Sequence, residues 1–162
     1  MAAIVLIGPM GSGKTTLGKR LAKELGLEFC DTDKMLAKDH GSITKIFEER
    51  GEAYFRQLET EYLELALQSS GVVATGGGIV LSERNRELLS GNLVVFLETD
   101  SDHVLSKINL SKRPLLKDNP NRWQEIFDER KPLYDAVATA TLYTGGKSIK
   151  GLIESLKELI AK

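Results

Sequence analysis

A short glycine-rich pattern near the start of the chain constrains its fold more than any other feature. Residues 8–15 read Gly-Pro-Met-Gly-Ser-Gly-Lys-Thr and fill every fixed position of the pattern G-x-x-x-x-G-K-[ST]. Glycines let the backbone bend so that successive N–H groups point inward at phosphate oxygens. In such a loop Lys14 reaches the β- and γ-phosphates, and the Thr15 hydroxyl binds Mg²⁺.

The residues on either side predict the two elements that such a loop requires. Residues 2–7 form a short apolar run typical of a buried strand. Leu17, Leu21 and Leu25 then recur at helical spacing, and Gly26 is a typical residue after a helix end. We therefore interpret the pattern as a nucleotide-binding loop and not as a chance glycine-rich turn. Its nucleotide-binding candidates are Gly11, Ser12, Gly13, Lys14, Thr15 and Thr16.

Length and charge exclude several classes of protein. With 162 residues and a net charge of −1, the chain predicts one domain that has its own core and no general attraction for nucleic acid or anionic membranes. The single cysteine, Cys30, excludes an internal disulfide, fits a reducing cytosol and is interpreted as a small buried side chain. The first residues lack a basic leader, and no apolar run reaches membrane-spanning length. We expect a cytoplasmic monomer without nucleic-acid or membrane partners.

Strand-like and helix-like segments alternate along the chain. After the first strand and helix, strands are predicted at 27–31, 71–75, 93–97 and 138–144, and helices at 33–40, 43–50, 52–69, 82–90, 101–107, 122–137 and 148–161. This alternation predicts an α/β fold with a parallel sheet between helices. Ligands then bind beyond the carboxyl ends of the strands, where the phosphate loop, residues 31–33 and residues 76–78 should meet. The polar stretch 108–121 is long enough to act as a lid.

Two aspartates at a strand end are candidates for polar chemistry. Asp31 and Asp33 would point to the same side of an extended chain. One could hold Mg²⁺ beside Thr15, directly or through water, and the other could orient a substrate hydroxyl or accept its proton. Asp33 could instead cap the following helix.

Glycines and arginines elsewhere leave alternatives open. Three consecutive glycines at 76–78 favour the close approach of another group to the backbone, although a flexible turn also fits. Arg56 shares a helix face with Glu59, which is equally typical of a surface ion-pair ladder. Arg130 alone is typical of a solvated side chain. Arg113 is either a lid arginine that neutralises a transferred phosphate or an isolated exposed side chain.

The ordered set of motifs resembles shikimate kinase over nearly the whole chain. The matching segments are GPMGSGKTT at 8–16, DTD at 31–33, GSITKIFEERGEAYFRQLE at 41–59, TGGGIV at 75–80, RPLL at 113–116 and ERKPLY at 129–134. Many families share the phosphate loop, but the complete set is specific. The resemblance implies a three-layer α/β/α P-loop fold like that of nucleoside-monophosphate kinases, with a five-stranded parallel sheet in the order 2-3-1-4-5. It implies one kinase domain over 1–162, with substrate-binding helices at about 33–60 and a lid at about 108–121.

The implied reaction transfers the γ-phosphoryl of ATP to the 3-hydroxyl of shikimate, on the pathway to chorismate and the aromatic amino acids, with Mg²⁺ as cofactor. By motif position, the shikimate-binding residues would be Asp33, Arg56, Gly77, Gly78 and Arg130, with the two arginines on the carboxylate and Asp33 on ring hydroxyls as the candidate base. Lys14 and Arg113 would stabilise the transferred phosphoryl. Thr15, with Asp31 through water, would hold the metal.

One position departs from the resemblance. Lys107 stands where family members often carry an arginine stacked on adenine, and lysine has no planar group to stack. Residues 144–148 could supply another wall for adenine. Two other functions remain open: a second small-molecule kinase of this fold, such as a gluconate kinase, and a non-catalytic module that ATP switches. The DTD and Phe55-Arg56 motifs argue against the first, and the second would need a partner surface.

Overall fold

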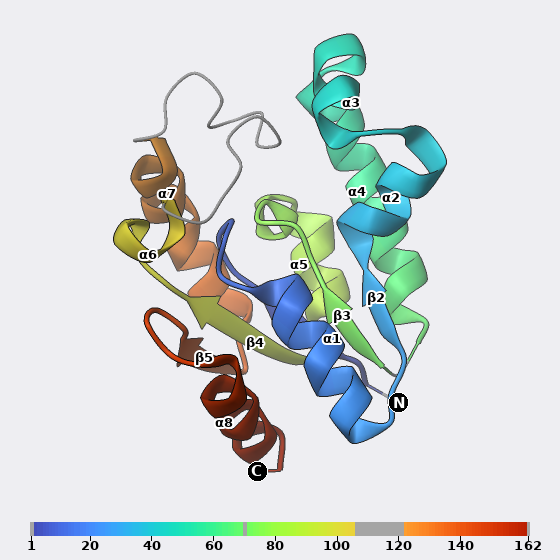
Figure 1. Cartoon of the computed structure of the whole chain (residues 1–162). Helices are drawn as coiled ribbons and strands as arrows, with labels where there is room; N and C mark the ends of the chain where they lie inside the picture. Colours follow the sequence, from blue (N-terminus) through green and yellow to red (C-terminus); the bar gives the residue numbers. More distant parts are fainter. Residues whose placement is uncertain (1, 70, 106–121, 162) are drawn as a thin grey trace.

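A five-stranded parallel sheet forms the centre of the molecule in the computed structural model, which describes residues 2–69, 71–105 and 122–161. The strands are β1 (Ile4–Ile7), β2 (Phe29–Asp31), β3 (Val72–Ala74), β4 (Leu93–Glu98) and β5 (Ala140–Tyr143). They lie in the order β2-β3-β1-β4-β5, and every neighbouring pair is parallel (Figure 1). The strand order implied by the resemblance is therefore confirmed.

Helices follow the strands nearly where the periodicity predicts them. They are α1 (Lys14–Leu25), α2 (Thr32–His40), α3 (Ile43–Arg50), α4 (Glu52–Leu67), α5 (Glu83–Leu89), α6 (Ser101–Leu105), α7 (Arg122–Val137) and α8 (Ile149–Ala161). A short 3₁₀ helix, η1 (Ile79–Leu81), was not predicted and follows the three glycines directly. The whole of the expected lid, 108–121, lies outside the described residues. None of the described helices has both the length and the apolar character needed to cross a membrane.

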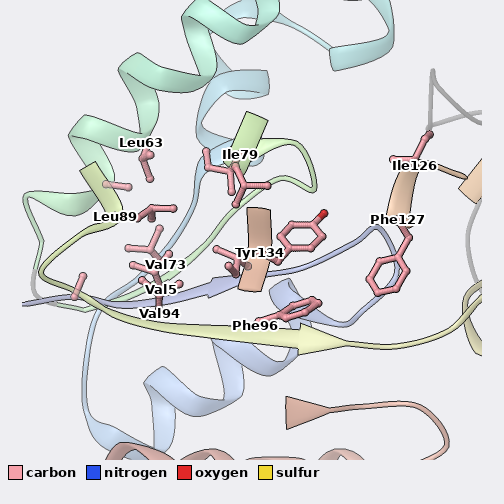
Figure 2. Close-up of a cluster of buried hydrophobic side chains, with 14 of the residues drawn as sticks. Val5, Leu63, Val73, Ile79, Leu89, Val94, Phe96, Ile126, Phe127 and Tyr134 are labelled. Atoms are coloured by element: carbon pink, nitrogen blue, oxygen red, sulfur yellow. The ribbon is translucent and has the colours of Figure 1, made fainter. Parts of the chain in front are cut away.

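The sheet is buried on both faces, which explains the continuous apolar runs of its central strands. Val5 and Ile7 of β1 pack with α4, α5 and α7 on one face, whereas Ile4 and Leu6 pack with α1 and α8 on the other. Figure 2 shows the first face, where Val5 lies among side chains of neighbouring strands and helices. Cys30 is only half-buried at the margin of this core. The predicted three layers are confirmed.

Helices α2, α3 and α4 form a smaller unit beside β2, at the upper right in Figure 1. The unit has its own apolar cluster, with Leu36, Ile46 and Phe55 among its buried members. Ser42 caps α3, because its hydroxyl accepts a hydrogen bond from the Lys45 N–H at 3.2 Å. This packing fixes α4 next to the sheet and so determines where its polar side chains point.

Two leucines of α4 provide a matched test of this packing. Leu63 is fully buried, whereas Leu65, two residues away, is 52% exposed. We expect Leu63→Ala to lower the free energy of unfolding by about 2–5 kcal/mol, because it leaves a cavity in the main core. Leu65→Ala should change it by less than about 0.5 kcal/mol. Urea unfolding of both variants measures the difference, and equal losses would contradict the described packing.

Candidate active site

The phosphate loop lies between β1 and α1, as predicted. Gly13 is the N-cap of α1 with a φ of 94°, in the left-handed region that favours glycine. It brings no side chain to cap the helix, and the first turn carries no acidic residue, so the N–H groups there are well placed for an anion. The Lys14 ammonium donates to the carbonyls of Gly8 (2.6 Å) and Pro9 (2.9 Å). The cation is thus buried within the bend of the loop.

Asp31 links this loop to the start of α2. Its Oδ2 accepts a hydrogen bond of 2.6 Å from the Thr15 hydroxyl, and its Oδ1 accepts one of 3.1 Å from the Lys34 N–H. Asp31 is therefore the N-cap of α2. The expectation of an extended segment from Asp31 to Asp33 was wrong, and so was the alternative that Asp33 is the cap. The strand ends at Asp31 and the helix begins at Thr32, which puts Asp33 in the first helical turn.

The three glycines after β3 lie against the polar side chains that the resemblance assigns to the substrate. A Cβ atom at Gly76 would lie 2.8 Å from both carboxylate oxygens of Asp33, one at Gly77 would lie 3.4 Å from Nη1 of Arg130, and one at Gly78 would lie 2.3 Å from Nη1 of Arg56. A Cβ atom at Gly76 or Gly78 would therefore force the charged side chain beside it to shift. The close-approach interpretation of the glycines is therefore favoured over a flexible turn.

Arg56 pairs with two glutamates of its own helix, as in the ladder considered above, but the Glu59 end of this ladder is buried. Arg56 Nη1 donates to Glu59 Oε1 at 3.1 Å, and Nη2 donates to Glu52 Oε2 at 3.2 Å. Glu59 is only 1% exposed, and no hydrogen-bond partner of its Oε2 occurs among the described residues. Burial raises the pKa of Glu59 to about 7; Arg56 and Arg130 oppose this rise, whereas Asp33 adds to it. Glu59 therefore lies in the field of all three candidate substrate-binding side chains.

Arg130 reaches the same place from α7 and is buried, so the interpretation as a solvated side chain was wrong. Burial lowers the pKa of Arg130, and the neighbouring Tyr134 opposes the change. An arginine nevertheless stays charged at neutral pH. Helix α7 also contacts the phosphate loop, because Trp123 Nε1 donates to the Met10 carbonyl at 2.9 Å. On the other side of the loop, the Thr144 hydroxyl donates to the Ser12 carbonyl at 3.2 Å.

The arrangement joins an anion-binding loop to a cluster of two guanidinium groups and a carboxylate around the three glycines. Glu59, Trp123 and Tyr134 belong to its framework but were missed as site residues. Glu59 and Tyr134 lie within segments that carry the resemblance, Tyr134 at the end of ERKPLY, whereas Trp123 carried no sequence signal. The described residues contain no group of three or more His, Cys, Asp or Glu side chains arranged to hold a metal ion. Lys107 and Arg113 lie outside the described residues.

The buried carboxyl of Glu59 predicts a pH-dependent stability. Between its ordinary pKa of 4.5 and about 7, the folded protein keeps a proton that the unfolded chain has lost. Stability contributed by the protonated carboxyl is therefore present below pH 4.5 and lost as the pH rises through 7. Relative to Glu59→Gln, which cannot titrate, the natural protein should lose about 3 kcal/mol of unfolding free energy across this range.

Urea unfolding of both proteins at pH 5, 6, 7 and 8 measures the difference. A constant gap between the two proteins over these pH values would show that Glu59 titrates normally and that its burial is misjudged.

Comparisons with known proteins place the chain in a family. A family model described as "Shikimate kinase" matches residues 10–161. The shikimate kinase of Salinispora arenicola is 44% identical over 161 residues, which cover 97% of this chain and 96% of that protein. The solved structure of shikimate kinase from Acinetobacter baumannii in complex with shikimate has a TM-score of 0.94 and 39% identity. The match covers 99% of this chain and 93% of that chain. The crystal structure of shikimate kinase from Aquifex aeolicus has a TM-score of 0.84 and 32% identity, and the match covers 98% of this chain and 96% of that chain. The chain therefore belongs to the shikimate kinase family.

Proposed function

We propose that this protein transfers the γ-phosphoryl of ATP to the 3-hydroxyl of shikimate, on the pathway to chorismate and the aromatic amino acids. The observation that carries the proposal is the gathering of Asp33, Arg56 and Arg130 around the three glycines at the end of β3. A relative that is 39% identical was solved in complex with shikimate, which supports the same acid as the substrate here. We further propose that the enzyme acts as a monomer in the cytoplasm.

The two guanidinium groups provide a site for a carboxylate. Arg56 and Arg130 come from different helices and both contact the glycine segment, Arg56 at Gly78 and Arg130 at Gly77. Guanidinium groups present parallel N–H donors that match the two oxygens of a carboxylate. We assign them to the shikimate carboxylate, with the backbone N–H of Gly77 or Gly78 as a further donor.

Asp33 lies on the other side of the same segment, against Gly76. A carboxylate there accepts hydrogen bonds from ring hydroxyls and holds the reacting hydroxyl in line with the phosphate. It is also the candidate base that receives the hydroxyl proton. Phosphoryl transfer depends chiefly on positioning and on neutralising charge, so the orienting role carries most of the expected effect.

The phosphate loop supplies the positive field for ATP. Residues 11–16 place backbone N–H groups and the start of α1 around the phosphates, and Lys14 stabilises charge on the transferred group. Arg113 would add a second positive charge from the lid segment. The adenine would lie near Lys107 and residues 144–148, where Thr144 already contacts the loop.

We propose that Thr15 and Asp31 hold Mg²⁺ together with the ATP phosphates, Asp31 directly or through water. The donor set fits, because a hydroxyl and a carboxylate meet at 2.6 Å and both are hard oxygen ligands. Mg²⁺ usually binds through one or two carboxylates and the substrate phosphates, which agrees with the lack of a larger acidic cluster among the described residues. When bound, the ion neutralises negative charge on the β- and γ-phosphates.

ADP release measured with shikimate, with gluconate and without an acceptor tests this function. We expect release to require both Mg²⁺ and shikimate, because the pocket is built for a hydroxylated carboxylic acid. Release that gluconate supports equally well would favour the second kinase, and tight ATP binding without any release would favour a binding module.

The Arg130→Ala variant tests the proposed carboxylate contact in the same assay. Loss of hydrogen bonds to a charged carboxylate should raise the KM for shikimate about 10- to 100-fold and change the KM for ATP little. Lys131→Ala is the matched control, since Lys131 is the next residue of α7 and pairs with Asp135 at the surface. A similar rise in both KM values would point to damaged folding instead of a lost carboxylate contact.

A further inference from the structure

The hydroxyl of Tyr134 connects two parts of the proposed acid site. Tyr134 lies in α7, one helical turn after Arg130, and is fully buried. Its hydroxyl donates a hydrogen bond of 2.6 Å to the carbonyl oxygen of Gly77, and the Arg130 guanidinium interacts with the same hydroxyl. The Tyr134 hydroxyl thus acts on both the arginine assigned to the carboxylate and the glycine segment.

The chemistry of the three groups fixes the role of the Tyr134 hydroxyl. A guanidinium group only donates, a carbonyl oxygen only accepts, and a hydroxyl has one proton to give. The Tyr134 hydroxyl gives that proton to Gly77, so its oxygen can meet Arg130 only as an acceptor. The hydroxyl proton is already used, so it cannot be shared with a substrate without breaking the contact to the glycine segment.

Packing holds the Tyr134 ring in place. The ring stacks on Phe96 of β4 with centroids 4.9 Å apart, and Phe127 lies on the same side at 6.5 Å. Figure 2 shows the Tyr134 ring and its oxygen next to these two aromatic rings. Because β4 is a central strand, the hydroxyl is a fixed point relative to the sheet.

The hydrogen bond from Tyr134 orients the glycine segment. A trans peptide is planar, so the N–H of Gly78 points opposite to the carbonyl of Gly77. Peptides between glycines turn easily because no Cβ restricts them. A hydrogen bond from a fixed hydroxyl to the Gly77 carbonyl therefore determines where the Gly78 N–H points.

We propose that Tyr134 is a positioning residue that holds the Arg130 guanidinium and the Gly77–Gly78 peptide in one arrangement for the acid substrate. The inference rests on the proposed function, because it assigns the two groups to shikimate. Tyr134 itself contacts no reacting atom. Its hydroxyl acts through the groups that do.

Tyr134→Phe tests the inference, with Tyr62→Phe as the matched control. Tyr62 is also buried, at 8% exposure, and its hydroxyl donates to Asp39 at the same distance of 2.6 Å, but within the α2–α4 unit. Each variant removes one hydroxyl from a buried ring, so both should lose comparable stability. We expect Tyr134→Phe to raise the KM for shikimate about tenfold and the KM for ATP less than twofold, whereas Tyr62→Phe changes neither.

A second arm separates this inference from the proposed function. Calorimetric titration of the natural protein with shikimate, together with ADP release, establishes the function first, and failure there refutes the function. In the Arg130→Ala background, Tyr134→Phe should lose part of its effect on shikimate binding, because one of its two partners is gone. An effect of the same size in both backgrounds would overturn the link through Arg130.

An unchanged KM for shikimate in folded Tyr134→Phe would overturn the inference and leave Tyr134 with a structural role only. If that variant does not fold, Phe96→Leu replaces it, since it loosens the stacked ring and keeps the hydroxyl. The same selective rise in the KM for shikimate is expected, and no rise would also overturn the inference.

Discussion

The candidate site depends on a stretch of backbone that has no side chains. Three glycines follow the central strand β3, and each lies against a charged side chain from a different part of the chain: α2, α4 and α7. A Cβ atom at Gly76 or Gly78 would overlap Asp33 or Arg56. The small size of glycine at positions 76 and 78 therefore lets Asp33 and Arg56 approach this backbone at the rim of the sheet, where Arg130 also lies.

Such convergence costs free energy, because like charges are brought together out of water. Arg56 and Arg130 each act on the other unfavourably, which is one cause of the lowered pKa of Arg130. Glu59 and Asp33 offset part of this cost, and Glu59 in turn carries a raised pKa because it is buried. The buried Glu59 and the half-buried Asp33 thus stand beside the two guanidinium groups, and an anionic substrate would complete the neutralisation.

The sequence predicted the fold because each local signal agreed with the others. The phosphate loop, the alternation of strands and helices and the glycines at helix ends all favoured one topology, and the observed strand order confirms it. Local signals could not decide which aspartate caps α2. Aspartate is common both at the N-cap and in the first helical turn, and a sequence does not locate the start of a helix to within one residue. They also could not reveal the burial of Glu59 or Arg130. That burial results from packing between α4, α7 and the glycine segment, which are far apart in sequence.

The convergence itself is tested most directly at Gly78. Alanine is compatible with the backbone there, where φ is −95°, but its Cβ would lie 2.3 Å from Nη1 of Arg56. The KM for shikimate of Gly78→Ala, measured beside its KM for ATP, is the decisive quantity. Our account predicts a rise of about tenfold or more for shikimate and little change for ATP, because Arg56 is displaced while the phosphate loop stays intact. A folded Gly78→Ala enzyme with an unaltered KM for shikimate would contradict it.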